Sequence, residues 1–295
     1  MATILDGVEL GREVRAEVAA GVAEMQARHG VTPGLAAVLV GGDPASAIYV
    51  RNKGRACDEA GMFSEIFHLA EDTTQAELLD LVARLNTDDR FHGILVQLPL
   101  PPQIEETVII EALNPAKDVD GLHPFNLGKL LQGVPDFIPA TPAGIQQILL
   151  RHGYDPSGKH VVVCGRSNIV GKPLATLLLQ RREGSNATVT VTHTRTANLP
   201  EITRQADILV AAIGQPRAIT ADMVKDGVVV IDVGVNRVDD PSRRRGYRLE
   251  GDVDFEPVSA RAEAITPVPG GVGPMTIAML LVNTLTAARI SIHGR

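Results

Sequence analysis

A tyrosine and a lysine lie four residues apart in a segment that we predict to be a helix. The segment runs from Ala45 to Gly61, so Tyr49 and Lys53 would lie on one face and could contact the same bound molecule. A lysine whose ammonium group loses solvent has a lowered pKa and can exchange protons near neutral pH. Gln97 follows an apolar, strand-like run that begins at Gly93. These residues indicate a catalytic site, although Tyr49 and Lys53 would fit a solvent-exposed helix face equally well.

A glycine-containing turn connects a predicted strand to a predicted helix in the second half of the chain. The strand, His160–Cys164, is followed by GRSNIVGKP at residues 165–173. Glycines let backbone amides approach an anion, and the N-terminus of a helix adds a partial positive charge that favours phosphate. The spacing differs from G-x-G-x-x-G. Taken alone, the turn fits a structural connection as well as it fits a dinucleotide site.

The residues after the next predicted strand favour NADP over NAD. In NAD-binding folds an Asp or Glu about 20 residues after the turn holds the ribose hydroxyls. Here that place is THTRT at residues 192–196, which contains Thr194 and Arg195 but no acid. A carboxylate would repel a 2′-phosphate, whereas an arginine with neighbouring hydroxyls suits one. The alternative explanation of Arg195 is an ordinary exposed loop charge.

Strands and helices alternate around these residues, which predicts a wound α/β fold. In the first half, strands are expected at 35–40, 65–69 and 93–97, after an opening helix with Leu10, Val14, Val18 and Val22. Thr74–Glu77 form a capping box at the start of the helix that lies between the second and third strands. In the second half, Thr141-Pro142 should cap a helix that ends near Gly153.

The second series predicts strands at 160–164, 188–192, 208–212 and 228–232, and a helix over roughly 170–182. Gly214 and Val235 follow the last two of these strands, at the edge where ligands bind in such sheets. The segment 114–139 is rich in Gly, Pro and Asp and should carry the crossing between domains. We therefore expect two wound α/β domains. The first comprises residues 1–140 and is joined by an apolar C-terminal helix at 275–295, and the second comprises residues 141–274.

Length and charge restrict the class of protein. A chain of 295 residues is long enough for two cores, and a net charge of −7 argues against nucleic acid or an anionic membrane as a partner. The N-terminus has no signal-peptide pattern, and we expect no apolar run to reach the length of a membrane span. Cys57 and Cys164 are expected to be free buried thiols. These features predict a cytoplasmic location and no metal site.

Seven motifs together resemble one enzyme family in order and spacing, nearly from end to end. They are YVRNK, GILVQLPLP, KDVDGLHPFN, GRSNIVGKP, AAIGQP, DVGVN and TPVPGGVGPMT. The chain is similar to the bifunctional methylenetetrahydrofolate dehydrogenase/methenyltetrahydrofolate cyclohydrolases. This resemblance implies a catalytic, folate-binding first domain, a Rossmann-type NADP-binding second domain, a cleft between the two domains, and a homodimer. It further implies oxidation of 5,10-methylenetetrahydrofolate by NADP, followed by hydrolysis to 10-formyltetrahydrofolate.

The resemblance also assigns roles to residues. It implies that Lys53 transfers protons in the hydrolytic step, that Gln97 positions Lys53, that Tyr49 packs on the folate, and that Asp120 binds the pterin edge, whose adjacent donors one carboxylate can accept. Further substrate-binding residues would be Leu98, Pro99, Pro269, Gly270 and Gly273. The cofactor-binding residues would be Gly165, Arg166, Ser167, Val170, Pro173, Thr194, Arg195, Gly214, Val235 and Thr276. Asp118 and His123 are expected to be structural.

Two other functions remain open from the sequence. Another NADP-dependent α/β oxidoreductase acting on a small acid would share the second domain and leave Lys53, Gln97 and Asp120 without a role. A nucleotide-sensing binding module would bind NADP without turnover. The chain contains no G-x-x-x-x-G-K-[ST] loop, so an ATP-driven formate–tetrahydrofolate ligase activity is not expected.

Overall fold

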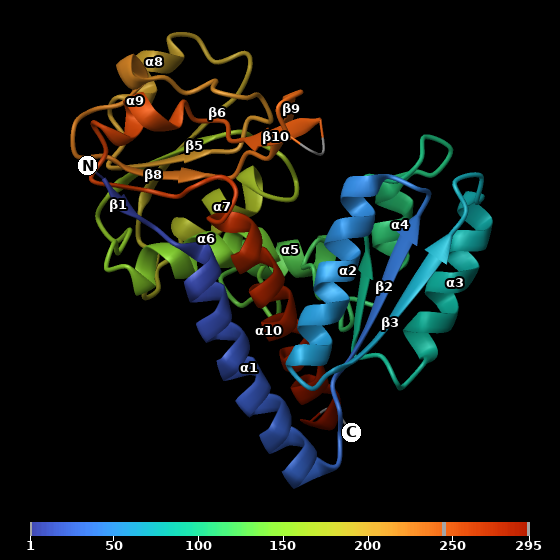
Figure 1. Cartoon of the computed structure of the whole chain (residues 1–295). Helices are drawn as coiled ribbons and strands as arrows, with labels where there is room; N and C mark the ends of the chain where they lie inside the picture. The colour runs from blue at the N-terminus through green and yellow to red at the C-terminus, as the bar shows by residue number, and fades with distance from the viewer. Residues whose placement is uncertain (1, 244–245, 294–295) are drawn as a thin grey trace. The chain divides into compact units, whose positions relative to one another are not determined.

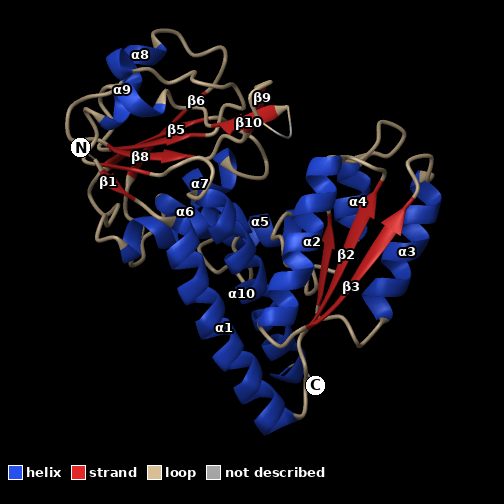
Figure 2. Ribbon diagram, in the orientation of Figure 1, coloured by secondary structure: helices blue, strands red, loops and turns tan. Residues whose placement is uncertain are grey.

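The computed structural model describes residues 2–243 and 246–293 and consists of two compact α/β units (Figure 1). The three-stranded unit contains Arg12–Ala140 and Ile277–Arg295, and the six-stranded unit contains Met1–Gly11 and Thr141–Thr276. Two long helices, α1 (Gly7–His29) and α10 (Val272–His293), contribute residues to both units. Each unit combines strands with packed helices (Figure 2), so the predicted class of fold, two wound α/β domains, is confirmed.

The sheet of the three-stranded unit is entirely parallel, in the order β3-β2-β4. Its strands are β2 (Gly34–Val40), β3 (Phe63–Leu69) and β4 (Gly93–Val96), close to the predicted ranges. All seven residues of the central strand β2 are buried, because helices cover both faces. One face packs on α3 (Gln75–Thr87) and α4 (Glu106–Ala112), and the other packs on α1, α2 (Pro44–Glu59) and α10.

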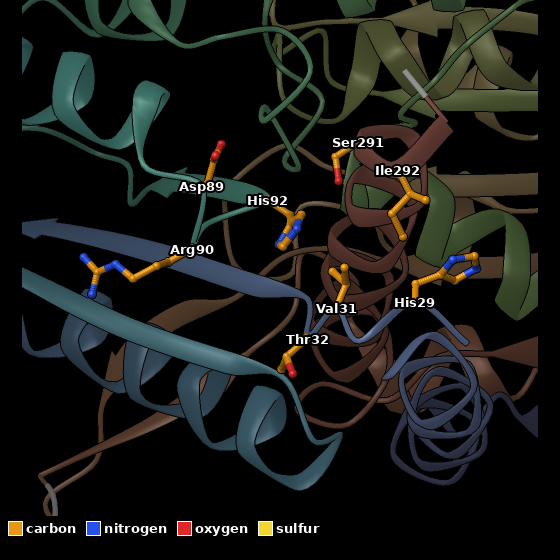
Figure 3. Close-up of a pocket in the computed structure, with 8 residues that line it drawn as sticks. All are labelled: His29, Val31, Thr32, Asp89, Arg90, His92, Ser291 and Ile292. Carbon is orange, nitrogen blue, oxygen red and sulfur yellow. The ribbon is translucent and has the colours of Figure 1, made fainter. Parts of the chain in front are cut away.

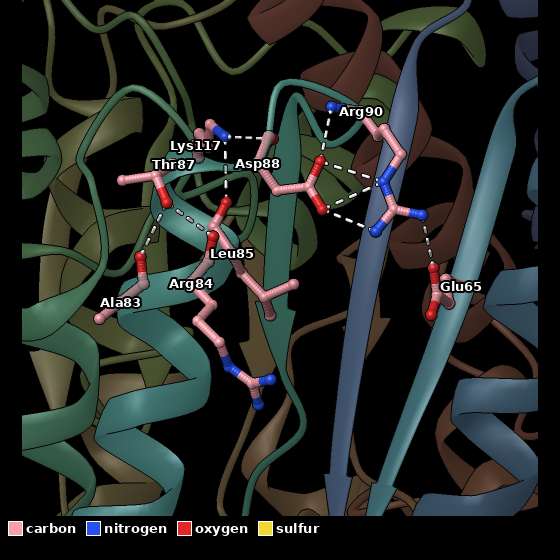
Figure 4. A network of polar contacts seen from close by, with 8 residues as sticks. All are labelled: Glu65, Ala83, Arg84, Leu85, Thr87, Asp88, Arg90 and Lys117. Carbon is pink, nitrogen blue, oxygen red and sulfur yellow. Dashed lines mark hydrogen bonds and ion pairs between the residues drawn. The ribbon is translucent and has the colours of Figure 1, made fainter.

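Helix α3 is fixed at both ends by hydrogen bonds. The predicted capping box is present: the Thr74 hydroxyl accepts from the Glu77 amide at 3.3 Å, and the Glu77 carboxylate accepts from the Thr74 amide at 2.8 Å. At the other end, Lys117 Nζ donates to the carbonyl oxygens of Leu85 and Asp88 at 3.1 and 2.8 Å (Figure 4). These contacts satisfy backbone groups that a helix leaves unpaired at its ends.

The sheet of the six-stranded unit has the order β1-β11-β8-β7-β5-β6, with every pair parallel. The strands are β1 (Thr3–Ile4), β5 (His160–Cys164), β6 (Thr188–Thr192), β7 (Ile208–Ala211), β8 (Val229–Asp232) and β11 (Ala264–Ile265). The chain runs outward from β5 to β6 and then crosses back over β5 to reach β7. The carboxyl ends of β5 and β7 therefore form the topological switch point, where ligands bind in open α/β sheets.

The first residues of the chain belong to the six-stranded unit, whereas the predicted division placed residues 1–140 together. Thr3 and Ile4 pair with Ala264 and Ile265, and the amide of Leu5 donates to the Ile265 carbonyl oxygen at 2.9 Å. A strand of two residues is too short to produce a periodic pattern. The sequence therefore gave no sign of this pairing.

Other boundaries also differ from the prediction. Helix α6 (Ala140–Arg151) begins before Thr141, so Thr141 lies in its first turn and does not cap it. Helix α7 (Gly171–Leu178) ends before the predicted residue 182. The Leu178 carbonyl oxygen accepts a hydrogen bond from the amide of Ala187, not from the amide of residue 182 as a continued helix would require. Helix α8 (Leu199–Thr203) and a 3-10 turn (Ala221–Met223) lie between the later strands, where helical segments were expected without stated bounds. The elements not predicted are α4, α5 (Pro124–Leu131), α9 (Phe255–Ser259), β1, β11 and the antiparallel pair β9 (Asn236–Asp239) and β10 (Tyr247–Glu250).

Helix α10 is more apolar than expected. Its segment Val272–Ile292 is long and apolar enough to cross a membrane by length and composition, contrary to the prediction that no run reaches that length. Leu280, Leu281 and Leu285 nevertheless lie in the core of the three-stranded unit beside α1 and β2. This packing is that of a core helix, and it agrees with the expectation that the C-terminal helix joins the first domain.

Candidate active site and cofactor edge

Lys53 lies on α2 with its side chain buried against the end of β4. Only 7% of the residue is exposed, and Nζ donates a hydrogen bond to Gln97 Oε1 at 3.1 Å. Gln97 is the first residue after β4, and its backbone amide donates to the Val38 carbonyl oxygen at 2.9 Å. Its side-chain amide donates to the Leu98 carbonyl oxygen at 2.7 Å, which fixes which of its side-chain atoms faces the lysine. The structure therefore brings Lys53 and Gln97 into direct contact.

The charges around Lys53 have opposing effects on its pKa. Burial lowers the pKa of Lys53 by disfavouring the ammonium form, and the nearby Asp120 raises it by a smaller amount. Asp120 is half-buried, and burial raises the pKa of its carboxyl group while Lys53 lowers it. Burial also raises the pKa of the Cys57 thiol to about 12, so Cys57 stays protonated at neutral pH. Lys53 and Asp120 thus form an electrostatically coupled pair.

Tyr49 lies one helical turn before Lys53, as the spacing predicted. It is 37% exposed, and burial of the remainder raises the pKa of its hydroxyl group. The phenol therefore stays neutral. A partly exposed ring one turn from a buried amine can pack against a flat ligand while the amine lies at the ligand's edge.

Asp118 and His123 have structural roles, as expected. The buried Asp118 carboxylate accepts hydrogen bonds from the amides of Leu122 and His123 and from the Asn126 side chain, at 2.8–3.2 Å. His123 caps α5, because its Nδ1 accepts from the Phe125 amide at 3.0 Å. These bonds fix the turn that presents Asp120.

The turn after β5 has close backbone packing that only glycine permits. A Cβ atom at Gly165, where φ is +131°, would lie 2.0 Å from the Ala212 carbonyl oxygen, and one at Gly171 would lie 2.2 Å from the Gly165 carbonyl oxygen. Ser167 Oγ accepts hydrogen bonds from the amides of Val170 and Gly171 at 3.1 and 3.4 Å. The turn is therefore narrow and preformed, which suits a ligand that must approach backbone closely.

Two arginines lie at one edge of the six-stranded sheet. Arg166 follows β5 and Arg195 follows β6, and these strands pair in register so that Cys164 lies opposite Thr192. Both arginines are exposed, and so are Ser167 and Thr194. The segments 165–168 and 193–196 contain no acid. This edge can therefore hold a phosphate group, and its residues fit NADP.

The remaining predicted cofactor residues have different surroundings. Gly214 and Val235 are exposed at the carboxyl ends of β7 and β8, on the same edge of the sheet as the two arginines. Val170 and Pro173 are buried. Thr276, at the start of α10, has its hydroxyl oxygen 3.0 Å from that of Thr141.

The predicted substrate loop is held by the start of α1. The amide of Gly7 donates to the Gly270 carbonyl oxygen at 2.9 Å, and a Cβ atom at Gly7 would lie 1.7 Å from the Gly271 carbonyl oxygen. Gly270 has φ of +113°, and a Cβ atom at Gly273 would have no neighbour within 4 Å among the described residues. Pro269 is exposed. Segment 267–273, which ends in the first residues of α10, is therefore held by the start of α1, while parts of its surface stay accessible.

A hollow of about 450 Å³ lies elsewhere in the three-stranded unit (Figure 3). It is lined by His29, Val31, Thr32, Asp89, Arg90, His92, Ser291 and Ile292. Thr32 and His92 precede β2 and β4, so the hollow lies at the amino edge of the sheet, whereas Gln97 lies at the carboxyl edge. Ligands in parallel α/β sheets bind at the carboxyl edge, so the Gln97 side is the better candidate site. No cluster of three or more potential metal-binding side chains occurs among residues 2–243 and 246–293.

Comparison with known proteins decides the family. The catalytic-domain model of the tetrahydrofolate dehydrogenase/cyclohydrolases matches residues 5–120, and the NAD(P)-binding-domain model of the same family matches residues 139–292. The chain belongs to the tetrahydrofolate dehydrogenase/cyclohydrolase family. The resemblance predicted from the motifs is confirmed.

Individual relatives agree with this family over nearly the whole chain. The chain is 56% identical to "Bifunctional protein FolD" of Prosthecochloris aestuarii over 284 residues, covering 96% of each chain. It is 54% identical to the protein of that name from Dehalococcoides mccartyi over 289 residues, covering 98% of this chain and 97% of that one. High identity over the full length of both chains means that family membership extends to both units.

Solved structures of the family superimpose closely. FolD from Campylobacter jejuni matches with a TM-score of 0.92 at 46% identity, covering 99% of this chain and 100% of that chain. The Trypanosoma brucei enzyme, solved with NADP and an inhibitor, matches with a TM-score of 0.94 at 40% identity, covering 99% and 98%. A shikimate dehydrogenase from Peptoclostridium difficile shares only the fold, with a TM-score of 0.51 at 12% identity over 85% of this chain and 89% of that chain.

Sequence reasoning missed two buried acids of the six-stranded unit, Asp232 and Asp252. Asp232 ends β8 within the DVGVN motif, which was noted for its position at the sheet edge and for the family resemblance, with no role given to the acid. No local sequence pattern predicts a role for Asp252, because the groups that donate hydrogen bonds to its side chain lie more than ten residues away in the sequence.

Proposed function

We propose that the chain oxidises 5,10-methylenetetrahydrofolate with NADP and then hydrolyses the 5,10-methenyl cation to 10-formyltetrahydrofolate. Membership of the bifunctional family supports both activities and the cofactor. The observation that carries the proposal is the buried Lys53, whose ammonium group donates to Gln97 and interacts with Asp120. Neither another oxidoreductase acting on a small acid nor a nucleotide sensor would need this arrangement.

The oxidative step places positive charge on the folate. When bound, NADP accepts a hydride from the methylene carbon. The product is a cation, so a permanently charged ammonium group nearby would oppose its formation. Burial lowers the pKa of Lys53 and so shifts its equilibrium towards the neutral amine, which weakens this repulsion. In this proposal Asp120 would accept hydrogen bonds from the donors of the pterin edge, and Tyr49 would pack on the ring.

The hydrolytic step needs a group that accepts a proton. Water attacks the methenyl carbon, and the neutral amine of Lys53 takes one proton from it. When the carbon–nitrogen bond of the bridge opens, Lys53 returns this proton to the leaving ring nitrogen, and the proton of the new hydroxyl group leaves to solvent as the formyl group forms. Gln97 accepts a hydrogen bond from Nζ and so holds the amine in place. Leu98, Pro99, Pro269, Gly270 and Gly273 complete the proposed substrate contacts.

The proposed cofactor site lies at the carboxyl edge of the six-stranded sheet. Gly165, Ser167 and Gly214 would admit the dinucleotide close to the backbone, and Arg166, Thr194 and Arg195 would hold the 2′-phosphate. Val170, Pro173, Val235 and Thr276 complete the proposed set. The predicted roles of the two domains, folate binding for residues 1–140 and NADP binding for residues 141–274, belong to the same proposal.

We also propose a cytoplasmic homodimer. The family resemblance supports the dimer, and the two free buried cysteines, Cys57 and Cys164, fit a reducing compartment. Light scattering of the purified chain should give twice the mass of 31.4 kDa. A monomer at micromolar concentration would contradict this part of the proposal.

The decisive experiment replaces Lys53 by methionine, which keeps the buried chain and removes the amine. Cyclohydrolase activity on methenyltetrahydrofolate should fall by at least about 10²-fold, the contribution of a positioned proton-transfer group, while the affinity for NADP stays unchanged. Lys117→Met is the matched control, because Lys117 is also partly buried but caps α3. Hydrolysis at a near-normal rate in Lys53→Met would overturn the proposal.

A further inference from the structure

Two buried carboxylates lie behind the proposed cofactor edge, and the mechanism above uses neither. Asp232 ends β8 and is 3% exposed, and Asp252 follows β10 and is fully buried. A buried carboxylate without partners would be costly, so its contacts show what it stabilises. In both cases these contacts are mainly backbone amides of the turns at the carboxyl edge of the sheet.

Asp252 organises the turn after β7. Its Oδ2 accepts hydrogen bonds from the amides of Ile213 and Gly214, and its Oδ1 accepts from the amide of Gln215 and the side-chain amide of Asn236. Three consecutive amides therefore point at one carboxylate, as they would around a bound anion. The amide of Gly214 is thus engaged inside the protein.

Asp232 supports the segment that carries Asp252. Its Oδ1 accepts from the amides of Asp252 and Gly234, both at 2.9 Å, and its Oδ2 accepts from the amide of Val253 at 2.9 Å. A Cβ atom at Gly234 would lie 2.2 Å from Asp252 Oδ1, so the turn after β8 packs directly on the second carboxylate. The turns after β7 and β8 are therefore joined through these two acids.

We propose that Asp252, supported by Asp232, is a positioning residue for NADP binding. It fixes Gly214 directly and, through Asn236 and Gly234, the turn that presents Val235. The backbone amides of residues 213–215 all donate to Asp252, so they cannot also donate to a phosphate. This turn would therefore contact NADP only by packing against it, and the phosphates would bind to the turn after β5 and to the two arginines. The inference rests on the proposed function, in which NADP binds at this edge.

The chemistry requires a carboxylate at position 252. Each of its two oxygens accepts two hydrogen bonds, so every acceptor site is in use. An asparagine would place an NH₂ group against two N–H donors in either orientation of its amide. Asp252→Asn should therefore displace part of the turn after β7 although its shape is nearly the same.

The test measures the two activities separately in Asp252→Asn. We expect the KM for NADP to rise at least tenfold, while cyclohydrolase activity on added methenyltetrahydrofolate, which needs no NADP, stays within twofold of the wild type. A general loss of folding would lower both activities together. Asp207→Asn is the matched control, because Asp207 accepts from the His160 amide and from Lys225 at the amino edge of the same sheet, and it should leave the KM for NADP unchanged.

Asp232→Asn keeps the inference testable if Asp252→Asn does not fold. An asparagine at 232 can keep the Oδ1 contacts and lose only the bond to Val253, so we expect a smaller increase in the KM for NADP, about threefold. An unchanged KM for NADP in folded Asp252→Asn, or equal losses of both activities, would overturn the inference. Failure of the proposed function would look different, since the wild type itself would then show no NADP-dependent turnover with methylenetetrahydrofolate.

Discussion

At the scale of single residues, burial and one neighbouring carboxylate control the chemistry of Lys53. Burial lowers the pKa of Lys53 and Asp120 raises it, with burial the larger effect. A base must be deprotonated to act, so the cyclohydrolase rate should rise with pH through this lowered pKa. Removing the charge in Asp120→Asn should lower the pKa of Lys53 further and move the rising limb of the kcat profile to lower pH. A limb that stays in place, or moves to higher pH, would show that the two groups are not coupled in this way.

The two arginines at the cofactor edge give a second test at this scale. Arg166 and Arg195 are exposed on neighbouring turns, and the segments 165–168 and 193–196 contain no acid. Loss of one charge-assisted contact to a phosphate is worth roughly 1.5–3 kcal/mol, so Arg195→Ala and Arg166→Ala should each raise the KM for NADP by about 10- to 100-fold. Steady-state kinetics with NAD, which lacks the 2′-phosphate, provide the control and should change little. Unaltered kinetics with NADP would remove these residues from the proposed site.

At the scale of elements, the capping box at the start of α3 should contribute to stability but not to activity. Thr74→Ala removes the capping box of α3 and should lower the free energy of unfolding by about 1 kcal/mol, measured by urea denaturation. Activity should be retained because α3 carries no proposed site residue. Thr87→Ala near the other end of the helix removes only weak hydroxyl contacts to backbone carbonyls and should cost less. Equal effects of the two changes would mean that the cap adds nothing specific.

Elements with a strong local signal could be predicted from the sequence. β2 is a continuous apolar run because it is covered on both faces, and the capping box can be seen from residue types alone. The family resemblance implied that Gln97 positions Lys53, and the two side chains are in contact. β1 and β11 are too short to carry a pattern, and Asp252 acts through turns that only the folded chain brings near it. These features depend on tertiary contacts, so no local pattern could reveal them.

At the scale of the whole molecule, Asp232 should influence how stability depends on pH. Burial raises its pKa to about 6 in the folded state, above the value of about 3.9 for an exposed aspartate. Between these values the folded state binds more protons than the unfolded state, so this residue's contribution to stability falls as pH rises from about 4 to 6. The pKa difference corresponds to roughly 3 kcal/mol.

Comparison with Asp232→Asn isolates this effect from all other carboxylates. The wild type should exceed the variant in free energy of unfolding by more at pH 4 than at pH 7, in urea titrations at both values. The opposite trend would mean that the hydrogen bonds from Asp252, Gly234 and Val253 outweigh burial in setting this pKa.

The pairing of β1 with β11 has a consequence for how the protein is made. Residues 3–4 need partners at 264–265, and the core around Leu35 needs Leu281 and Leu285. On the ribosome, the six-stranded unit can therefore be completed only after residue 265 has been synthesised, and the three-stranded unit only after residue 285. Until then the growing chain exposes apolar surface that these later residues cover, and this is the state in which nascent proteins depend on chaperones.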